Sequence, residues 1–143
     1  MCEQPKACAV RAMQWVQTDS WLDSAQDRLE RWIEQGIPPR ISHHARDVRQ
    51  LERAISFGDI KIAVENGQVI HRDLDTEAHQ EHLLILAWLR TSPKKFRPVH
   101  VSLLLSDDGT DAFIKTVYDP RSYDWIWADN YTRRVCWCNG KNL

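Results

Sequence analysis

Hydrophobic residues change their spacing near the middle of the chain, and this change limits the folds that the sequence can adopt. Before about residue 67, apolar side chains recur every three or four positions, as at Leu22, Ala25, Leu29 and Ile33, which is the period of an amphipathic helix. After Gly67 the segments QVIHRDLD, VHVSLLLS and DAFIKTVYD favour strands, and the first alternates with a period of two. Helices followed by strands predict an α+β fold, with N-terminal helices packed on one face of a four-stranded antiparallel sheet.

Turn-forming residues set the expected limits of these elements. The segment GIPPR (36–40) ends the first helical region, and we place there the boundary between an N-terminal helical extension (1–36) and the main domain (37–143). Ser42 is a suitable N-cap for a helix that runs to Gly58. The apolar run HLLILAWLR is typical of a central strand, PKKFRP predicts a basic loop, and DDGT supplies an Asp-Gly turn. An irregular tail is expected from Pro120 onward.

Composition narrows the class of protein further. A chain of 143 residues suits one domain, and its net charge of −1 gives no overall attraction to nucleic acid or to anionic membranes. No apolar run approaches the roughly 20 residues of a membrane span, and the first ten residues do not have the order of a signal peptide. The four cysteines lie only near the two ends of the chain, which is not the pattern of a disulfide framework. We therefore predict a cytoplasmic protein without a membrane partner.

The start of the predicted helix after Ser42 carries a first candidate site. His44 stands close to Arg46 and Arg49, and His43 precedes it. Histidine transfers protons near neutral pH, and arginine holds phosphates or a charged transition state. The same residues also fit an ordinary solvated helix end. Adjacent helical positions point about 100° apart, so the sequence leaves open which histidine faces a site.

A second candidate lies in the hairpin that turns at Asp108-Gly109. His100 near the start of one strand, and Thr116 and Tyr118 near the end of the next, are expected at the same end of the sheet. Their hydroxyl groups would suit a phosphate or a base. The alternative is that Thr and Tyr are present because they pack well in strands.

Basic and metal-binding patterns give two weaker candidates. Lysines and arginines alternate with aromatic residues in PKKFRP and TRRVCW, a composition used to bind single-stranded nucleic acid, although a solvated loop and tail fit equally. His79 and His82 with Cys136 and Cys138 would supply four zinc ligands, at spacings that match zinc modules poorly. We predict no cofactor and no metal.

Four stretches follow one another in the order of a known family: HHARDVRQLERAISFGDI, PVHVSLLLSDDG, IKTVYDP and DWIWADNYTRR. Together they cover about residues 41 to 134. In this order they resemble a widespread family of small bacterial proteins known only as a domain of unknown function. That family is similar to the RelE-like toxins, within the barnase, EndoU, colicin and RelE ribonuclease superfamily.

The resemblance implies a RelE-like fold and a metal-independent endoribonuclease. In this reaction a ribose 2′-hydroxyl attacks the adjacent phosphate, which requires a general base, a general acid and a cation near the developing charge. On this resemblance His44 and His100 would be acid and base, and Arg46 or Arg49 would stabilise the charge. The residues that would orient the phosphate are Thr116 and Tyr118, and those that would hold the RNA backbone are Lys94, Lys95, Arg133 and Arg134.

The resemblance also implies partners. RelE-like toxins are usually controlled by a second protein, so we expect an antitoxin or immunity protein besides RNA; the oligomeric state is left open. The alternative is a non-catalytic protein- or RNA-binding module on the same fold. The near-neutral charge favours this alternative. So does a departure from the family pattern: Val48 stands four residues after His44, where the family usually has an arginine.

Overall fold

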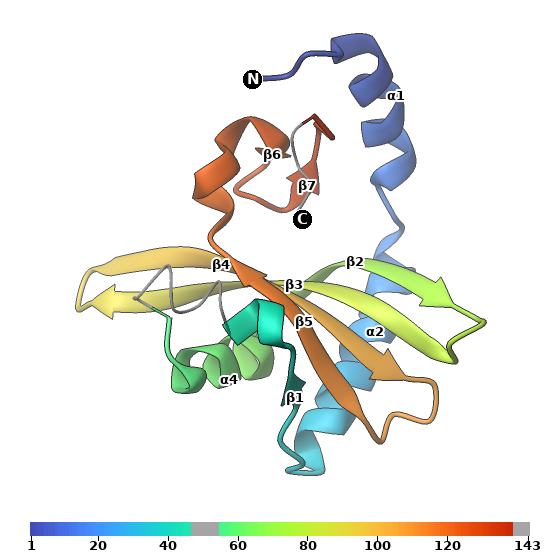
Figure 1. Ribbon diagram of the computed structural model, residues 1–143, viewed down its shortest axis with the longest axis vertical. Coiled ribbons are helices and arrows are strands. Elements are labelled where there is room, and N and C mark those ends of the chain that lie inside the picture. Colours follow the sequence, from blue (N-terminus) through green and yellow to red (C-terminus); the bar gives the residue numbers. More distant parts are fainter. Residues whose placement is uncertain (47–54, 139–143) are drawn as a thin grey trace.

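The computed structural model describes residues 1–46 and 55–138 (Figure 1). Helices dominate the first half of the chain and strands the second, so the predicted α+β class is confirmed. In chain order the elements are α1 (Pro5–Trp15), α2 (Asp19–Glu34), β1 (Arg40–Ile41), α4 (Phe57–Asn66), β2 (Gln68–Asp75), β3 (Gln80–Ser92), β4 (Lys95–Ser106), β5 (Ala112–Tyr118), the 3-10 helix η1 (Pro120–Ile126), β6 (Trp127–Ala128) and β7 (Arg133–Arg134).

The main sheet has five strands in the order β1-β5-β4-β3-β2. Strands β2 to β5 form the expected antiparallel meander, because each pairs with the next through a hairpin. Strand β1 pairs with β5 in parallel, with Arg40 opposite Phe113, so the sheet is mixed rather than purely antiparallel. The prediction of four strands missed β1 because two residues are too few to show a strand period.

Helices α2 and α4 cover one face of this sheet and form the main core with it (Figure 1). Leu29 of α2 and Ile60 of α4 are fully or almost fully buried, as is Leu103 of β4. Each such side chain contributes roughly 1.5–3 kcal/mol through burial. Helix α2 therefore packs in the same core as the sheet that follows it.

The opposite face is partly covered by α1 and the C-terminal segment, which lie side by side in Figure 1. Cys8 and Trp15 of α1 pack with Trp127 and Cys136 against the sheet residues of this face, such as Leu86. The expectation that helices pack on one face only is therefore wrong. Helix α1 contributes few buried residues, and its weak apolar pattern did not indicate which face it would cover.

Two predicted boundaries also differ from the structure. Ser42 does cap the helical residues His43–Arg46, because its hydroxyl oxygen accepts a hydrogen bond from the Ala45 amide. The helix does not continue to Gly58, because Ile55 and Ser56 are non-helical and Ser56 caps α4 in a reciprocal pair with Asp59. The basic segment 93–98 is largely strand rather than loop, since β4 begins at Lys95. Among the described residues, no helix is both long and apolar enough to span a membrane.

Candidate functional site

A cleft of about 630 Å³ opens on the second face of the sheet, between the exposed part of that face, α1 and the C-terminal segment. Its size is within the range of small-ligand sites. Its lining is rich in basic and aromatic side chains: Arg11, Gln14, Trp15, Gln17, His44, His71, Asp73, His82, Leu84, Ser102, Lys115, Thr116, Tyr118, Trp127, Arg134 and Trp137.

The floor of the cleft follows from strand register. Asp73 of β2 lies opposite His82 of β3, and Ser102 of β4 lies opposite Thr116 of β5. Alternate residues of a strand point to the same face, so these polar side chains gather on the face that α2 and α4 leave open. The opposite set of β3 and β4 residues, such as Leu83 and Leu103, fills the main core.

An irregularity in β5 adds a cation to this floor. Ser102 pairs with Thr116 while the next residue of β4, Leu103, pairs with Ile114, so Lys115 is an extra residue between the two pairs. Such a β-bulge changes the direction of side chains next to it. Lys115 and Thr116 consequently both line the cleft although they are neighbours in sequence.

His82 is a partly buried histidine in the floor of the cleft. Its Nε2 is in close contact with the Ser102 hydroxyl oxygen. Burial lowers the pKa of His82, and the positive charge of Lys115 lowers it further. The imidazole is therefore neutral at neutral pH and able to accept a proton.

His71 occupies the adjacent side of the cleft. Its Nδ1 lies 3.4 Å from an Asp73 carboxylate oxygen, and its ring stacks on Trp15 with 4.3 Å between ring centroids. The hydrogen bond from His71 lowers the pKa of Asp73. Among the described residues that line the cleft, Asp73 carries the only carboxylate, and this histidine holds it.

His44 reaches the cleft from the helix that begins after β1. The Ser42 hydroxyl donates a 2.6 Å hydrogen bond to the backbone oxygen of Lys115, which fixes the helix start beside β5. His43 and His44 are both exposed, but of the two His44 alone lines the cleft. Arg46 is exposed and is not part of the lining, and Arg49 lies outside the described residues.

His100 lies beneath the cleft rather than in it. The side chain is fully buried, and Trp127 packs edge-on against its ring with centroids 4.4 Å apart. His100 Nε2 is 2.8 Å from the Tyr131 carbonyl oxygen, which can only accept, so Nε2 carries the proton and Nδ1 accepts from the Tyr118 hydroxyl at 3.0 Å. Burial lowers the pKa of His100 to about 4 and raises that of Tyr118. His100 is thus neutral and serves to orient Tyr118.

The sequence-predicted basic residues are divided between the cleft and the rest of the surface. Arg134 lines the cleft, while Arg133 pairs with Asp129 through a 2.8 Å contact and is not part of the lining. Lys94 and Lys95 are exposed at the β3–β4 turn, away from the lining residues.

Sequence reasoning missed Arg11, Lys115 and His71 as site residues. His71 and Asp73 stand two apart in an alternating strand, which was a usable signal that they share a face. No local sequence pattern indicates the bulge at Lys115. The same holds for the position of α1, which carries Arg11.

The zinc set considered from the sequence is not assembled. His82 lies in the cleft, whereas His79 is exposed at the β2–β3 turn, with its Nδ1 3.8 Å from an Asp107 carboxylate oxygen. Cys136 and Cys138 gather instead with Cys2 and Cys8, the one group of potential metal ligands of this kind among the residues the structure describes.

A family model described as "Domain of unknown function (DUF4258)" matches residues 41–119, more than half of the 143-residue chain. No match was found among curated proteins or among solved structures. The matched segment contains β2 to β5 of the main sheet and hence the strands that form the floor of the cleft. The wall formed by α1 and the C-terminal segment lies outside it.

Proposed function

The chain belongs to the DUF4258 family, a domain of unknown function, and from this premise we propose that it is a metal-independent endoribonuclease of the RelE-like toxin kind. One observation carries the proposal. Among the residues that the structure describes, three histidines and three cationic side chains line one cleft, and the one carboxylate in that lining, Asp73, is hydrogen-bonded to His71. A cleft of this charge attracts a phosphate, and its imidazoles can move protons near neutral pH.

His82 is the general base of the proposed reaction. Its lowered pKa leaves the ring free to accept a proton at neutral pH. It takes the proton of the ribose 2′-hydroxyl as that oxygen attacks the adjacent phosphorus. The phosphorus–5′-oxygen bond then breaks, which leaves a 2′,3′-cyclic phosphate on one product.

His44 is the general acid, which donates a proton to the departing 5′-oxygen. It projects into the cleft from a different element than His82, so the two histidines can flank one phosphate. This pairing replaces the pair of His44 and His100 expected from the sequence, because His100 is buried and bonded at both ring nitrogens.

Lys115 and Arg134 stabilise the charge that develops on the phosphate oxygens. They take the role that the sequence suggested for Arg46 or Arg49. Thr116 remains suited to orient the phosphate, since it lines the cleft next to Lys115. Tyr118 also lines the cleft, but its hydroxyl proton is donated to His100 Nδ1 and is not available to a phosphate oxygen. Among the aromatic lining residues, Trp137 is partly exposed, and such rings can stack on unpaired bases.

Cleavage of RNA with EDTA present tests this proposal. The substrates are a labelled single-stranded RNA, free or on translating ribosomes, and the same RNA with a 2′-deoxy nucleotide at the cleaved position. The wild-type protein should release a cyclic phosphate and a 5′-hydroxyl from the first substrate and leave the second intact. His82→Ala and His44→Ala should each slow cleavage by about 10²–10⁴-fold without unfolding the protein, the usual effect of losing a general acid or base.

His43→Ala is the matched control, because His43 is exposed and adjacent to His44 but does not line the cleft. It should cleave at the wild-type rate. Full activity of folded His82→Ala and His44→Ala would contradict the assigned roles. No cleavage of either free or ribosome-associated RNA by the wild type would favour a non-catalytic binding module on this fold. An antitoxin or immunity protein that blocks the cleft is the partner expected of an active toxin.

A further inference from the structure

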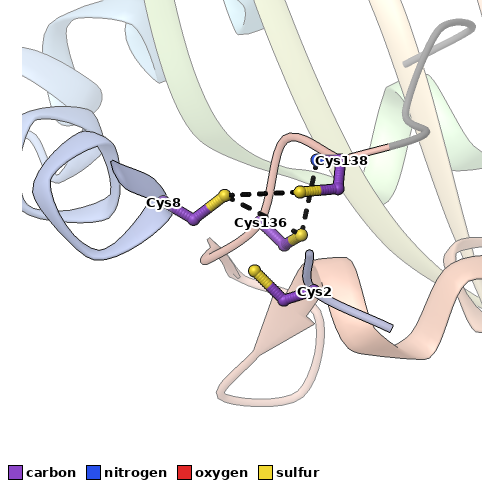
Figure 2. A group of neighbouring side chains, drawn as sticks. All are labelled: Cys2, Cys8, Cys136 and Cys138. Atoms are coloured by element: carbon purple, nitrogen blue, oxygen red, sulfur yellow. Dashed lines mark hydrogen bonds between the residues drawn. The ribbon is translucent and has the colours of Figure 1, made fainter. Parts of the chain in front are cut away.

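All four cysteines of the chain meet in one cluster at the junction of its two ends (Figure 2). Cys2 and Cys8 come from the N-terminal segment and α1, and Cys136 and Cys138 follow β7. The four sulfur atoms lie within 4.8 Å of one another. Cys8 and Cys136 are buried, while Cys2 and Cys138 are partly exposed.

The spacing of the sulfurs is close to that required around a single tetrahedral metal ion. Four thiolates at the usual Zn–S distance of about 2.3 Å stand about 3.8 Å from one another. Cys8 Sγ lies 3.8 Å from Cys138 Sγ and 4.0 Å from Cys136 Sγ. A disulfide requires about 2.05 Å between sulfurs, and all four cysteines are free.

Backbone amides around the cluster point at the sulfurs as they do around metal-bound thiolates. The amide of Glu3 donates to Cys138 Sγ at 3.4 Å, and that of Trp137 donates to Cys8 Sγ at 3.5 Å. The amide of Cys138 donates to Cys136 Sγ at 3.4 Å (Figure 2). Hydrogen bonds from outside the ligand set orient the ligands and offset their negative charge.

We propose that Cys2, Cys8, Cys136 and Cys138 bind one structural Zn²⁺ ion. The four thiolates complete a tetrahedral coordination shell, so no position is left for water or substrate. The ion is therefore separate from the proposed cleavage chemistry, which uses none of these residues. A Cys₄ set also distinguishes this site from the mixed His and Cys set that the sequence suggested.

The ion would hold α1 against the C-terminal segment. Helix α1 has 11 residues and buries only Cys8 and Ala12, so apolar packing gives it little attachment to the rest of the protein. Arg11 and Trp15 on this helix, and Arg134 and Trp137 on the other segment, line the cleft. The Arg11 and Arg134 guanidinium groups both lie over the Trp137 ring, at 4.8 and 4.9 Å. A zinc clamp would thus fix one wall of the cleft.

The test is the metal content of the full chain, expressed with added Zn²⁺ and purified under reducing conditions without chelator. Elemental analysis should find about one zinc per chain. Cys8→Ser and Cys136→Ser should each lower this content at least about tenfold, given how strongly such sites depend on each thiolate. His79→Ala is the control and should keep its zinc, because His79 is exposed and outside the cluster.

A measurement on the wild type keeps the proposal testable where a cysteine variant fails to fold. Titration with an organomercurial should release zinc in proportion to the modification of four thiols. Replacement by Co²⁺ should give the absorption of a tetrahedral tetrathiolate complex. Wild-type protein without zinc, stoichiometric iron in its place, or cysteine variants that retain full zinc would each overturn the proposal.

Discussion

His100 and Tyr118 face each other across β4 and β5, and the Tyr118 hydroxyl donates a 3.0 Å hydrogen bond to His100 Nδ1. The other ring nitrogen of His100 donates to the Tyr131 carbonyl oxygen, so the fold requires a neutral ring. Burial accordingly lowers the pKa of His100 to about 4, against 6.5 for a solvated histidine. A proton on Nδ1 would remove the acceptor of the Tyr118 hydrogen bond.

This relationship predicts a pH-dependent stability. Between pH 6.5 and pH 4 the unfolded chain binds a proton at His100 that the folded chain does not. The free energy of unfolding should therefore fall by about 3 kcal/mol from this group as pH is lowered through that window. Urea unfolding at pH 7 and at pH 4 measures the fall.

Comparison with His100→Gln isolates the contribution of His100 to this fall, since glutamine can both donate and accept hydrogen bonds but does not titrate. The variant should lose most of the extra sensitivity to acid, whereas His43→Gln, at an exposed position, should keep it. An equal decrease for His100→Gln and the wild type would contradict the assignment of this effect to His100.

The assignment of His82 as the general base predicts the pH below which RNA cleavage slows, that is, the position of the acidic limb of the pH–rate profile. Because the pKa of His82 is lowered, kcat/KM for RNA cleavage should begin to fall only below about pH 6.5, the usual histidine value. The charge of Lys115 contributes to the lowering, so Lys115→Met should move the acidic limb to higher pH. The value of kcat/KM is measured with a labelled RNA at each pH at which the protein remains folded.

Lys94→Met provides the comparison, because Lys94 is an exposed lysine that does not line the cleft. It should leave the position of the limb unchanged. If both lysine variants shift the limb equally, general electrostatics rather than the His82–Lys115 proximity would explain the effect.

The strands were largely predictable from the sequence, since each carries a local signal. QVIHRDLD matches β2 from Gln68 to Asp75, because alternation and the preceding Gly67 mark both its face and its start. Strand β1 was not predictable, because Arg40 and Ile41 pair with β5 only through distant contacts. The start of α4 was missed because the Ser56 cap lies inside a pattern that also reads as a continuous helix.

The candidate site was predictable only where one strand or one helix start determines it. The Ser42 cap places His44 beside β5, and the hairpin register places Thr116 and Tyr118 on one face. The depth of His100 depends on Trp127 and Tyr131 folding back over it, which no local pattern indicates. The cysteine cluster likewise joins positions 128 or more residues apart. The spacing between cysteines within either end of the chain therefore did not indicate that the two pairs meet.

Close packing at Gly67 predicts a costly substitution. A Cβ atom at this position would collide with the Ala63 carbonyl oxygen and a methyl group of Ile85. The backbone φ of −79° is accessible to any residue, so the cost is steric. Gly67→Ala should lower the free energy of unfolding by about 1–3 kcal/mol in urea titrations, as overpacking does.

Gly58→Ala, within helix α4 that Gly67 follows, is the matched substitution. The added Cβ would meet only the Ser56 hydroxyl oxygen, at an ordinary 3.6 Å. Alanine also favours helix by up to about 1 kcal/mol over glycine, so this variant should be as stable as the wild type or more stable. Equal losses at both glycines would rule out the close contact at Gly67 as the cause.

A buried ion pair between β2 and β3 predicts the largest loss of stability. Both Arg72 Nε and Nη2 donate to Glu81 Oε2, at 3.0 and 2.8 Å, and Arg28 donates to the other Glu81 oxygen at 3.0 Å. The Glu81 and Arg72 side chains are only 3% and 9% exposed. Glu81→Ala leaves the Arg72 charge buried without its partner, which should cost about 3–5 kcal/mol in the free energy of unfolding.

The exposed pair of Arg40 and Asp111 shows what burial adds to such an interaction. Its shortest contact is 2.7 Å, but its side chains are 66% and 53% exposed, so Arg40→Ala should cost less than about 1 kcal/mol. Raising the salt concentration should weaken the Arg40–Asp111 contribution and leave that of Glu81 largely unchanged, because salt screens exposed charges more than buried ones. A Glu81→Ala cost no larger than that of Arg40→Ala would mean that Arg72 finds water or another partner when Glu81 is removed.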